Sequence, residues 1–327
     1  MIDRSRVYDI VYALMARDGR EAELFGNCAQ LAHDAFVRSC AGNAFPELWF
    51  EIPLAGEPWF DLHALTARET LESGGSFSAE ETGGYPELFE WFATAQGVRQ
   101  LALSYDVHTG TIDSPAVQLL ARDSAARHLP FLELVAGESV ANDFRAFVKR
   151  LPDGWFPCYT GVFPGREGMG VRVECIPADD LQRAYASDAA LLEEHLRRVG
   201  LEQLGDTVVP RCQLLARSPF RLEFQFDVRE DGVPGATFGA SVRFQGPFDD
   251  ASGLFGPNGA VGKLMECVEG WGLADGRWRR LAETVFAKRI TCGDASVRAI
   301  GHPAFVKLRW RAGEPLDAKA YLRAEVL

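Results

Sequence analysis

Residues 304–327, AFVKLRWRAGEPLDAKAYLRAEVL, form the stretch of sequence from which the fold is best derived. On either side of a Gly313-Glu314-Pro315 turn, apolar side chains alternate with polar ones. This period of two is typical of β-strands that have one apolar and one polar face. The polar positions carry lysine and arginine, although the 327-residue chain has a formal net charge of -12. The sequence therefore predicts a terminal β-hairpin with a local cationic face.

The overall composition restricts the class of protein. With 47% hydrophobic and 24% charged residues, the chain is typical of a soluble globular protein. Its negative charge argues against nucleic acid and an anionic membrane surface as partners. We find no signal peptide and no apolar run as long as a membrane span. The seven scattered cysteines contain no C-x-x-C pair, so we expect free thiols in the cytoplasm and no metal site.

The alternating pattern of the terminal hairpin recurs four times earlier in the chain, with helical patterns between the strand pairs. Strand pairs are predicted at 48–52 and 60–65, 100–107 and 116–121, 156–163 and 170–176, 220–228 and 237–244, and in the two halves of 304–327. Helices are predicted at 3–40 with a break at 18–20, and at 86–94, 140–150, 179–199, 208–216, 261–271 and 277–287. Residues 1–327 are therefore interpreted as one α+β domain of five α-β-β-α units.

Two architectures accommodate these strands, because each pair has one apolar and one polar face. An open antiparallel sheet would pack helices on its apolar face and expose its polar face to water. A closed ten-stranded antiparallel barrel would have its helices outside and its polar face inside, without free edge strands. Such a barrel is too wide to be filled by side chains, so its interior would hold solvent and a ligand.

Five α-β-β-α units in this order, together with the Lys319-Ala320-Tyr321-Leu322 strand, resemble the ABBA aromatic prenyltransferases, in which Lys-x-Tyr strands hold a diphosphate. The resemblance implies the closed barrel, with an allylic prenyl diphosphate inside it. It also implies transfer of the prenyl group to an aromatic small molecule or to a peptide side chain. No cofactor is required in that chemistry, while Mg²⁺ can assist the diphosphate.

The resemblance and the predicted inner face together define the candidate site residues. Arginine binds phosphate through a bidentate fork and lysine through a point charge. The candidate diphosphate ligands are Arg172, Arg243, Lys307, Arg309, Lys319 and Tyr321. Aromatic faces stabilise an allylic cation, and Trp49 and Tyr159 are the candidates for this shield. Glu51 is the candidate general base, provided that burial raises its pKa towards neutrality. The competing candidates for that role are Asp61, Asp106 and His63.

Two further classes of function stay open at this stage. A guanidine-modifying enzyme of the pentein type also has five α/β repeats and needs a late nucleophilic cysteine, for which Cys292 is the candidate. A non-catalytic barrel or sheet would bind a small hydrophobic ligand or a peptide. Cys158 and Cys175 are expected on the outer, apolar face as small buried side chains. Convergence of the candidate cations inside a closed barrel would favour the transferase.

Overall fold

The computed structural model describes residues 4–40, 47–68, 84–109, 111–121, 125–164, 170–244, 251–292 and 295–326. The first half of the chain forms α1 (Arg4–Ala16), the π-helix η1 (Glu21–Phe25), α2 (Ala29–Cys40), β1 (Glu47–Pro53), β2 (Asp61–Ala67), α4 (Pro86–Thr94), β3 (Gln100–Asp106), η2 (Val107–Thr109), β4 (Thr111–Leu120), η3 (Ala125–Arg127) and α5 (Leu129–Val148). The second half forms β5 (Trp155–Val162), β6 (Val171–Pro177), α6 (Asp179–Ser187), α7 (Ala189–Arg198), α8 (Val208–Arg217), β7 (Arg221–Val228), η4 (Glu230–Gly232), β8 (Pro234–Arg243), α9 (Ala251–Phe255), α10 (Ala260–Gly270), η5 (Gly276–Thr284), β9 (Phe286–Cys292), β10 (Ala295–Arg311) and β11 (Glu314–Val326).

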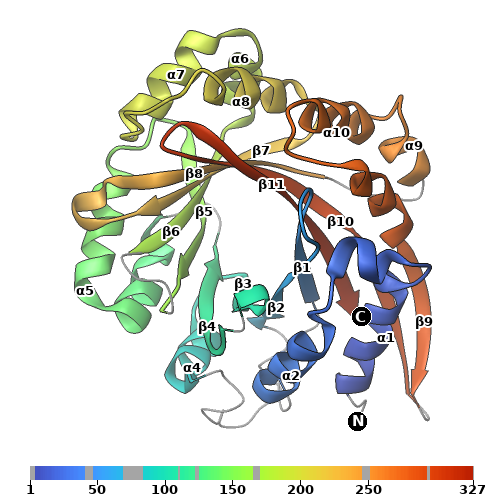
Figure 1. Cartoon of the computed structure of the whole chain (residues 1–327). Coiled ribbons are helices and arrows are strands. Elements are labelled where there is room, and N and C mark those ends of the chain that lie inside the picture. The colour runs from blue at the N-terminus through green and yellow to red at the C-terminus, as the bar shows by residue number, and fades with distance from the viewer. Residues whose placement is uncertain are drawn as a thin grey trace.

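Hydrogen bonding closes the strands into a barrel. Neighbouring strands are antiparallel in the order β11-β1-β2-β3-β4-β5-β6-β7-β8-β10, and β10 also pairs with β11. The ring is completed where the last strand pairs with the first, with Tyr321 opposite Glu51. Figure 1 shows the strands around a central space and the helices outside them. The predicted ten-stranded barrel is therefore confirmed, and the open sheet is wrong.

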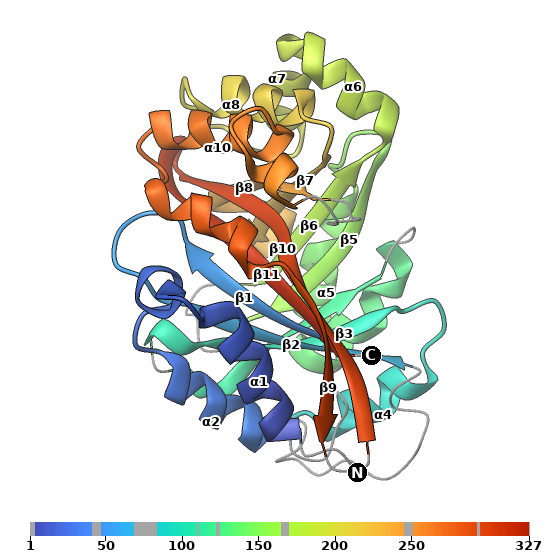
Figure 2. The same cartoon turned by 90° about the vertical axis from the view of Figure 1, so that its right-hand side faces the viewer.

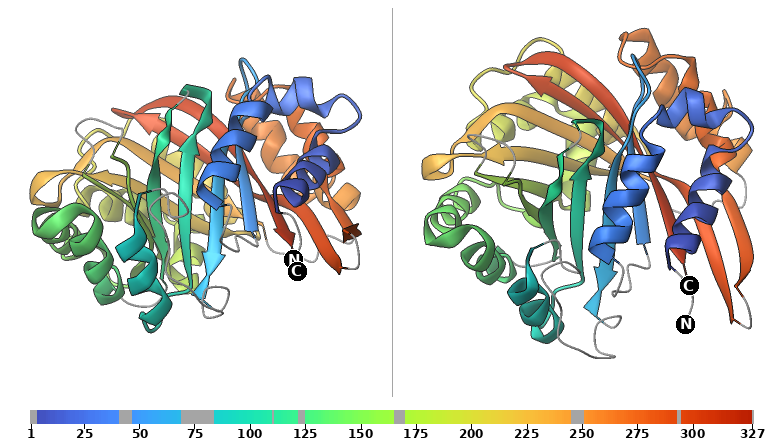
Figure 3. Two further views of the ribbon diagram at one scale, coloured as in Figure 1. Left: turned by 90° about the horizontal axis from the view of Figure 1, so that it is seen from below. Right: turned by 60° about the horizontal axis from the view of Figure 1, so that its bottom comes forward.

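The apolar strand face points outward against the helices. Phe50 on β1, Leu103 on β3, Phe224 on β7 and Leu308 on β10 are fully buried in one continuous core. The helices supply the other side of this core, with Phe144 on α5 as an example. Figure 3, which views the barrel from below and obliquely, shows the blue, teal and green helices outside the ring of strands. The helices bury the apolar face, so the polar side chains point into the barrel.

An eleventh strand lies outside the predicted barrel. The predicted helix 277–287 is wrong after Thr284, because β9 follows it and pairs with the first part of β10. This two-stranded arm extends away from the ring in Figure 2. Phe286 and Ile290 are buried in the arm, whereas Lys288 and Arg289 are exposed. β10 therefore begins well before the predicted strand, with one part in the arm and the other in the barrel.

Two helices also differ from their predicted bounds. The predicted helix 179–199 is divided at Asp188, whose φ of -117° and ψ of 95° are extended. The Asp188 carboxylate accepts the N–H of Leu191 at 2.9 Å and so caps α7. Helix α5 begins at Leu129 and bends at Gly137, whose φ of 85° is favourable only for glycine.

The closing strand provides a test of the architecture. Leu322 on β11 lies opposite Phe50 of β1 and Pro303 of β10, and its side chain is fully buried. We expect Leu322→Ala to lower the free energy of unfolding by about 2–5 kcal/mol, because it leaves a cavity beneath the helices. Urea denaturation measures this change. The control is Leu316→Ala, since Leu316 lies on the same strand and is 38% exposed. Equal stability of the two variants would contradict the assigned closure.

Candidate functional site

A cavity of about 600 Å³ occupies the inside of the barrel. Its volume lies in the range of small-molecule sites. Most of the predicted polar face lines it: Trp49, Glu51, Asp61, His63, Asp106, His108, Gln118, Tyr159, Arg172, Glu174, Glu223, Gln225, Arg243, Lys307, Arg309, Lys319, Tyr321 and Arg323. All the candidate site residues therefore face one chamber.

The chamber is also lined by side chains that were not predicted to face it, and Phe305, Trp59 and Cys158 are three of them. Phe305 follows the same alternation as Lys307 and Arg309, so its inward position could have been derived from the period of β10. Trp59 lies in the connection after β1, where no periodic signal exists. Cys158 was expected on the outer face and instead lines the cavity. A register shift between Pro157 and Tyr159 breaks the alternation of β5 at this point.

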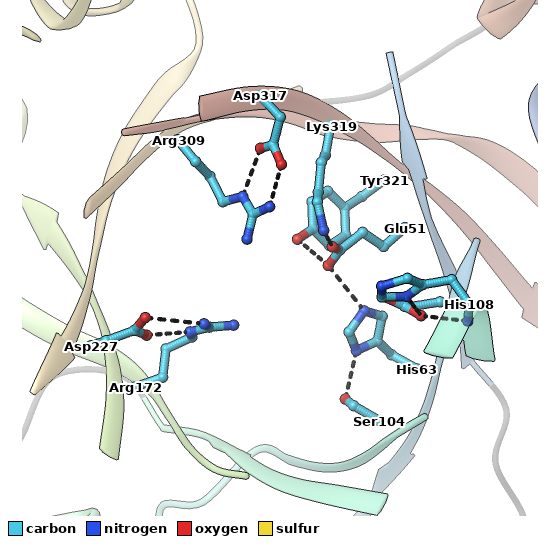
Figure 4. Close-up of polar contacts among 11 residues, drawn as sticks. Glu51, His63, Ser104, His108, Arg172, Asp227, Arg309, Asp317, Lys319 and Tyr321 are labelled. Carbon is cyan, nitrogen blue, oxygen red and sulfur yellow. Dashed lines mark hydrogen bonds and ion pairs between the residues drawn. The ribbon is translucent and has the colours of Figure 1, made fainter. Parts of the chain in front are cut away.

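Glu51 is the centre of a polar cluster at the β1–β11 junction. The ammonium of Lys319 and the hydroxyl of Tyr321 both donate hydrogen bonds to its carboxylate. On β2, His63 Nε2 lies 3.5 Å from Glu51 Oε2, and His63 Nδ1 lies 2.5 Å from Ser104 Oγ. Figure 4 shows these side chains converging on the open centre of the barrel. Lys319 and Tyr321, separated by one residue, thus point to the same carboxylate.

The electrostatic environment of Glu51 differs from the one expected for a general base. Burial raises the pKa of this carboxyl, but Lys319, His63 and Lys307 together lower it by more. The net result is a pKa well below the ordinary value of 4.5. The condition for Glu51 to act as a general base, a pKa raised towards neutrality, is therefore not met. Without a ligand, Glu51 is an ionised group that holds Lys319 and Tyr321 in place.

Two arginines are oriented by aspartates on neighbouring strands. Arg172 Nε lies 2.7 Å from Asp227 Oδ1, and its Nη2 lies 3.4 Å from Asp227 Oδ2. Arg309 makes the same two-point contact with Asp317, at 2.6 Å from Nε to Oδ1. In both cases the contacting atoms are Nε and Nη2. Figure 4 shows the third nitrogen of each guanidinium directed into the centre of the chamber. This leaves Nη1 oriented to bind an anionic ligand.

The remaining candidate cations occupy two different surroundings. Lys307 Nζ lies 5.0 Å from the centre of the Tyr321 ring and 3.9 Å from Glu174. Its pKa is influenced by both Glu51 and Arg172, which places it within electrostatic reach of the cluster just described.

Arg243 instead belongs to an aromatic region of the chamber. Its guanidinium binds Glu223 at 2.8 and 3.1 Å. It also lies over the rings of Trp49 and Phe305, at 5.4 and 5.1 Å from their centres. Arg243, which sequence reasoning had grouped with the candidate diphosphate ligands, is therefore held by Glu223 and by two aromatic rings.

An aromatic pair lies beside Lys319. The rings of Trp59 and His108 stack with their centres 4.1 Å apart, and Lys319 Nζ lies 4.7 Å from the Trp59 ring centre. His108 is held by Asp61, whose Oδ1 lies 2.8 Å from Nδ1. Asp61, a competing candidate for the general base, thus positions His108.

Solved structures share this architecture. The 5-dimethylallyltryptophan synthase from Streptomyces coelicolor matches with a TM-score of 0.55 at 15% sequence identity, over 97% of both chains. The ABBA prenyltransferase fold is therefore established for this chain. The apo form of the prenyltransferase PriB matches with a TM-score of 0.55 at 15% identity. Its ternary complex with L-tryptophan and dimethylallyl thiolodiphosphate matches at 0.54 and 14%, and both matches cover 98% of this chain and 96% of PriB. No protein-family model and no curated protein sequence matches the chain.

The described part of this ABBA barrel contains no group of three or more His, Cys, Asp or Glu side chains that could hold a metal ion. The cysteines with described side chains are free thiols: Cys28, Cys158, Cys175, Cys212 and Cys267. The side chain of Cys292, the candidate pentein nucleophile, lies outside the described residues. Within the described segments, no helix is both long and apolar enough to cross a membrane.

The pairing of Glu51 with Lys319 makes stability sensitive to the loss of the cation. We expect Lys319→Met to lower the free energy of unfolding by about 3–5 kcal/mol, because Glu51 stays buried without its nearest cation. The double variant with Glu51→Gln should be more stable than Lys319→Met alone. Chemical denaturation of the two single variants and the double variant measures this coupling. Lys263→Met, at an exposed position on α10, is the control. Additive effects of the two substitutions would contradict the pairing.

The low pKa of Glu51 also predicts a pH dependence. A carboxyl whose pKa is lowered by folding stabilises the folded state above the ordinary carboxyl pKa. As the pH falls below about 4.5, the unfolded chain takes up this proton first, and the stabilisation decreases. The difference in unfolding free energy between wild type and Glu51→Gln should therefore decrease from pH 6 towards pH 3. A pH-independent difference would show that the carboxyl has no lowered pKa.

Proposed function

We propose that this protein transfers an allylic prenyl group from a diphosphate donor to an aromatic small molecule or to an aromatic side chain of a peptide. The observation that carries the proposal is the convergence of Arg172, Arg309, Lys319 and Tyr321 on one open space inside a closed barrel (Figure 4). Such oriented donors suit a diphosphate, which carries several negative oxygen atoms. The proposal is further supported by the PriB structures, which include a complex with product diphosphate.

The cationic cluster would assist departure of the diphosphate. When the allylic carbon–oxygen bond breaks, negative charge accumulates on the diphosphate. Nη1 of Arg172, Nη1 of Arg309 and the Lys319 ammonium are the groups that would stabilise it. Asp227 and Asp317 hold the arginines before the donor arrives. Little reorganisation is then needed at the moment of reaction, which is the condition for efficient electrostatic stabilisation.

The aromatic walls would stabilise the allylic cation and exclude water from it. Phe305 and Tyr321 stack with their ring centres 3.9 Å apart, and Trp49 lies 5.3 Å from Phe305. Tyr159 also lines the chamber. A cation over such a ring is stabilised by about 0.5–2 kcal/mol, depending on its solvation. The proposed shield therefore contains Trp49 and Tyr159, as expected from the sequence, and also Phe305.

A bound cofactor is not needed in this proposal, since side-chain cations stabilise the leaving group. Measuring the affinity of the protein for the donor first in the presence of EDTA and then with added Mg²⁺ shows whether the ion strengthens donor binding. We also infer that the protein works in the cytoplasm, where free thiols persist. The free thiols of Cys28, Cys158, Cys175, Cys212 and Cys267 support this inference.

Calorimetry tests the donor site. We expect wild type to bind dimethylallyl or geranyl thiolodiphosphate, and Arg172→Met and Arg309→Met each to weaken this binding about 10- to 100-fold through loss of charge-assisted hydrogen bonds. The matched control is Arg298→Met, because Arg298 is exposed on the part of β10 that forms the arm. Thermal unfolding establishes that each variant is folded.

Mass spectrometry of a reaction with dimethylallyl diphosphate and L-tryptophan tests the transfer itself. A mass increase of one dimethylallyl group on the acceptor is the expected result. Failure of wild type to bind either thiolodiphosphate at millimolar concentration would overturn the proposed function.

A further inference from the structure

We infer that Glu174, on β6, accepts the proton that the aromatic acceptor loses, and that Lys307 transmits this proton towards the diphosphate. The inference rests on the proposed transferase function. It assigns to Glu174 the proton transfer that sequence reasoning had assigned to Glu51.

Glu174 is a chamber carboxylate with only long contacts to its neighbours. Its Oε1 lies 3.4 Å from Ser241 Oγ and 3.9 Å from Lys307 Nζ. Two other chamber carboxylates contact donors more closely. Glu223 lies 2.8 Å from Arg243, and Glu51 accepts short hydrogen bonds from Lys319 and Tyr321. Glu174 thus faces the ligand cavity, and its carboxylate has longer contacts to donors than the carboxylates of Glu223 and Glu51.

The surroundings of Glu174 favour its protonated form. Burial raises its pKa, Lys307 lowers it and the neighbouring Glu223 raises it again, with a net increase. Arg243 and Ser241 on β8 and Lys307 on β10 favour the charged form, but they do not offset burial. A general base is most effective when its pKa approaches the working pH. The pKa of Glu174 is shifted in that direction, whereas the pKa of Glu51 is shifted away from it.

Lys307 lies between Glu174 and the candidate diphosphate ligands. Its ammonium is 3.9 Å from Glu174, and Glu51 and Arg172 both influence its pKa. Burial lowers the pKa of Lys307, which makes the loss of one proton easier. The rings of Phe305 and Tyr321 flank the ammonium at 5.4 and 5.0 Å. These contacts place a proton donor beside both Glu174 and Tyr321, which is one of the candidate diphosphate ligands.

The proposed step balances without another reactant. The allylic C–O bond breaks with its electron pair on the diphosphate, and a ring carbon of the acceptor forms the new C–C bond. The C–H bond at that ring carbon then breaks, its electron pair returns to the ring, and the proton binds Glu174. Lys307 gives one proton to the diphosphate and takes up the proton of Glu174. Both side chains end in their starting states.

The test separates ionisation of the donor from deprotonation of the acceptor. The enzyme variants are wild type, Glu174→Gln, Glu174→Asp and the control Glu193→Gln, whose partly exposed side chain lies on α7. Each is assayed with dimethylallyl diphosphate for diphosphate release without acceptor, and for transfer to L-tryptophan. We expect Glu174→Gln to retain diphosphate release, while transfer falls about 100-fold or more. Glu174→Asp should recover part of the transfer, and Glu193→Gln should resemble wild type.

Isotopic substitution distinguishes a proton acceptor from a structural residue. With ring-deuterated tryptophan, Glu174→Gln should show a larger primary isotope effect than wild type, because loss of the ring proton becomes rate-limiting. Unchanged transfer in Glu174→Gln, or equal losses of transfer and diphosphate release without a larger isotope effect, would overturn the inference and leave the proposed function intact. Absence of both donor binding and transfer in wild type would instead overturn the proposed function.

Discussion

Pairing between β1 and β11 is the constraint on which the site depends. These strands come from opposite parts of the chain, and Glu51 meets Lys319 and Tyr321 only because the two strands are neighbours. Closure of the barrel also changes the solvation of the charged side chains on the polar strand face. On an open sheet its charges would be solvated, whereas inside a barrel each buried charge needs a partner. The ion pairs of the chamber are therefore a direct consequence of the fold.

The pairing of cations with carboxylates changes how a diphosphate would be recognised. A chamber of unpaired cations would attract an anion by its net charge, but in the absence of the anion the cations would repel one another. Asp227 and Asp317 remove that repulsion and fix the planes of Arg172 and Arg309. The remaining guanidinium donors are then directed at the ligand without rearrangement. Geometry rather than excess charge would therefore provide most of the selectivity for the diphosphate.

Alternation along single strands was sufficient to predict the strand pairs and most of their polar face, whereas closure into a barrel was expected from the resemblance to the ABBA prenyltransferases. The period of two is a local property of each strand, so it can be recognised without knowledge of the partner strand. The pairing of Arg309 with Asp317 was not predictable in this way, because it depends on the register between β10 and β11. The inward position of Cys158 depends on a bulge, which the pattern of its own strand does not show. Phe305 shares the alternation of Lys307 and Arg309, so its inward position follows from the same local period.

The same dependence on register explains why the chemistry of individual carboxylates could not be derived from the sequence. Glu51 and Glu174 are both buried glutamates on the polar face, and burial raises the pKa of each. They differ in how closely cations approach them. Lys319 hydrogen-bonds Glu51, whereas Lys307 lies 3.9 Å from Glu174. Environments that shift two carboxyl pKa values in opposite directions are a general means of dividing roles between them. In the proposed transferase, the division would be between a group that holds cations for the donor and a group that takes a proton from the acceptor.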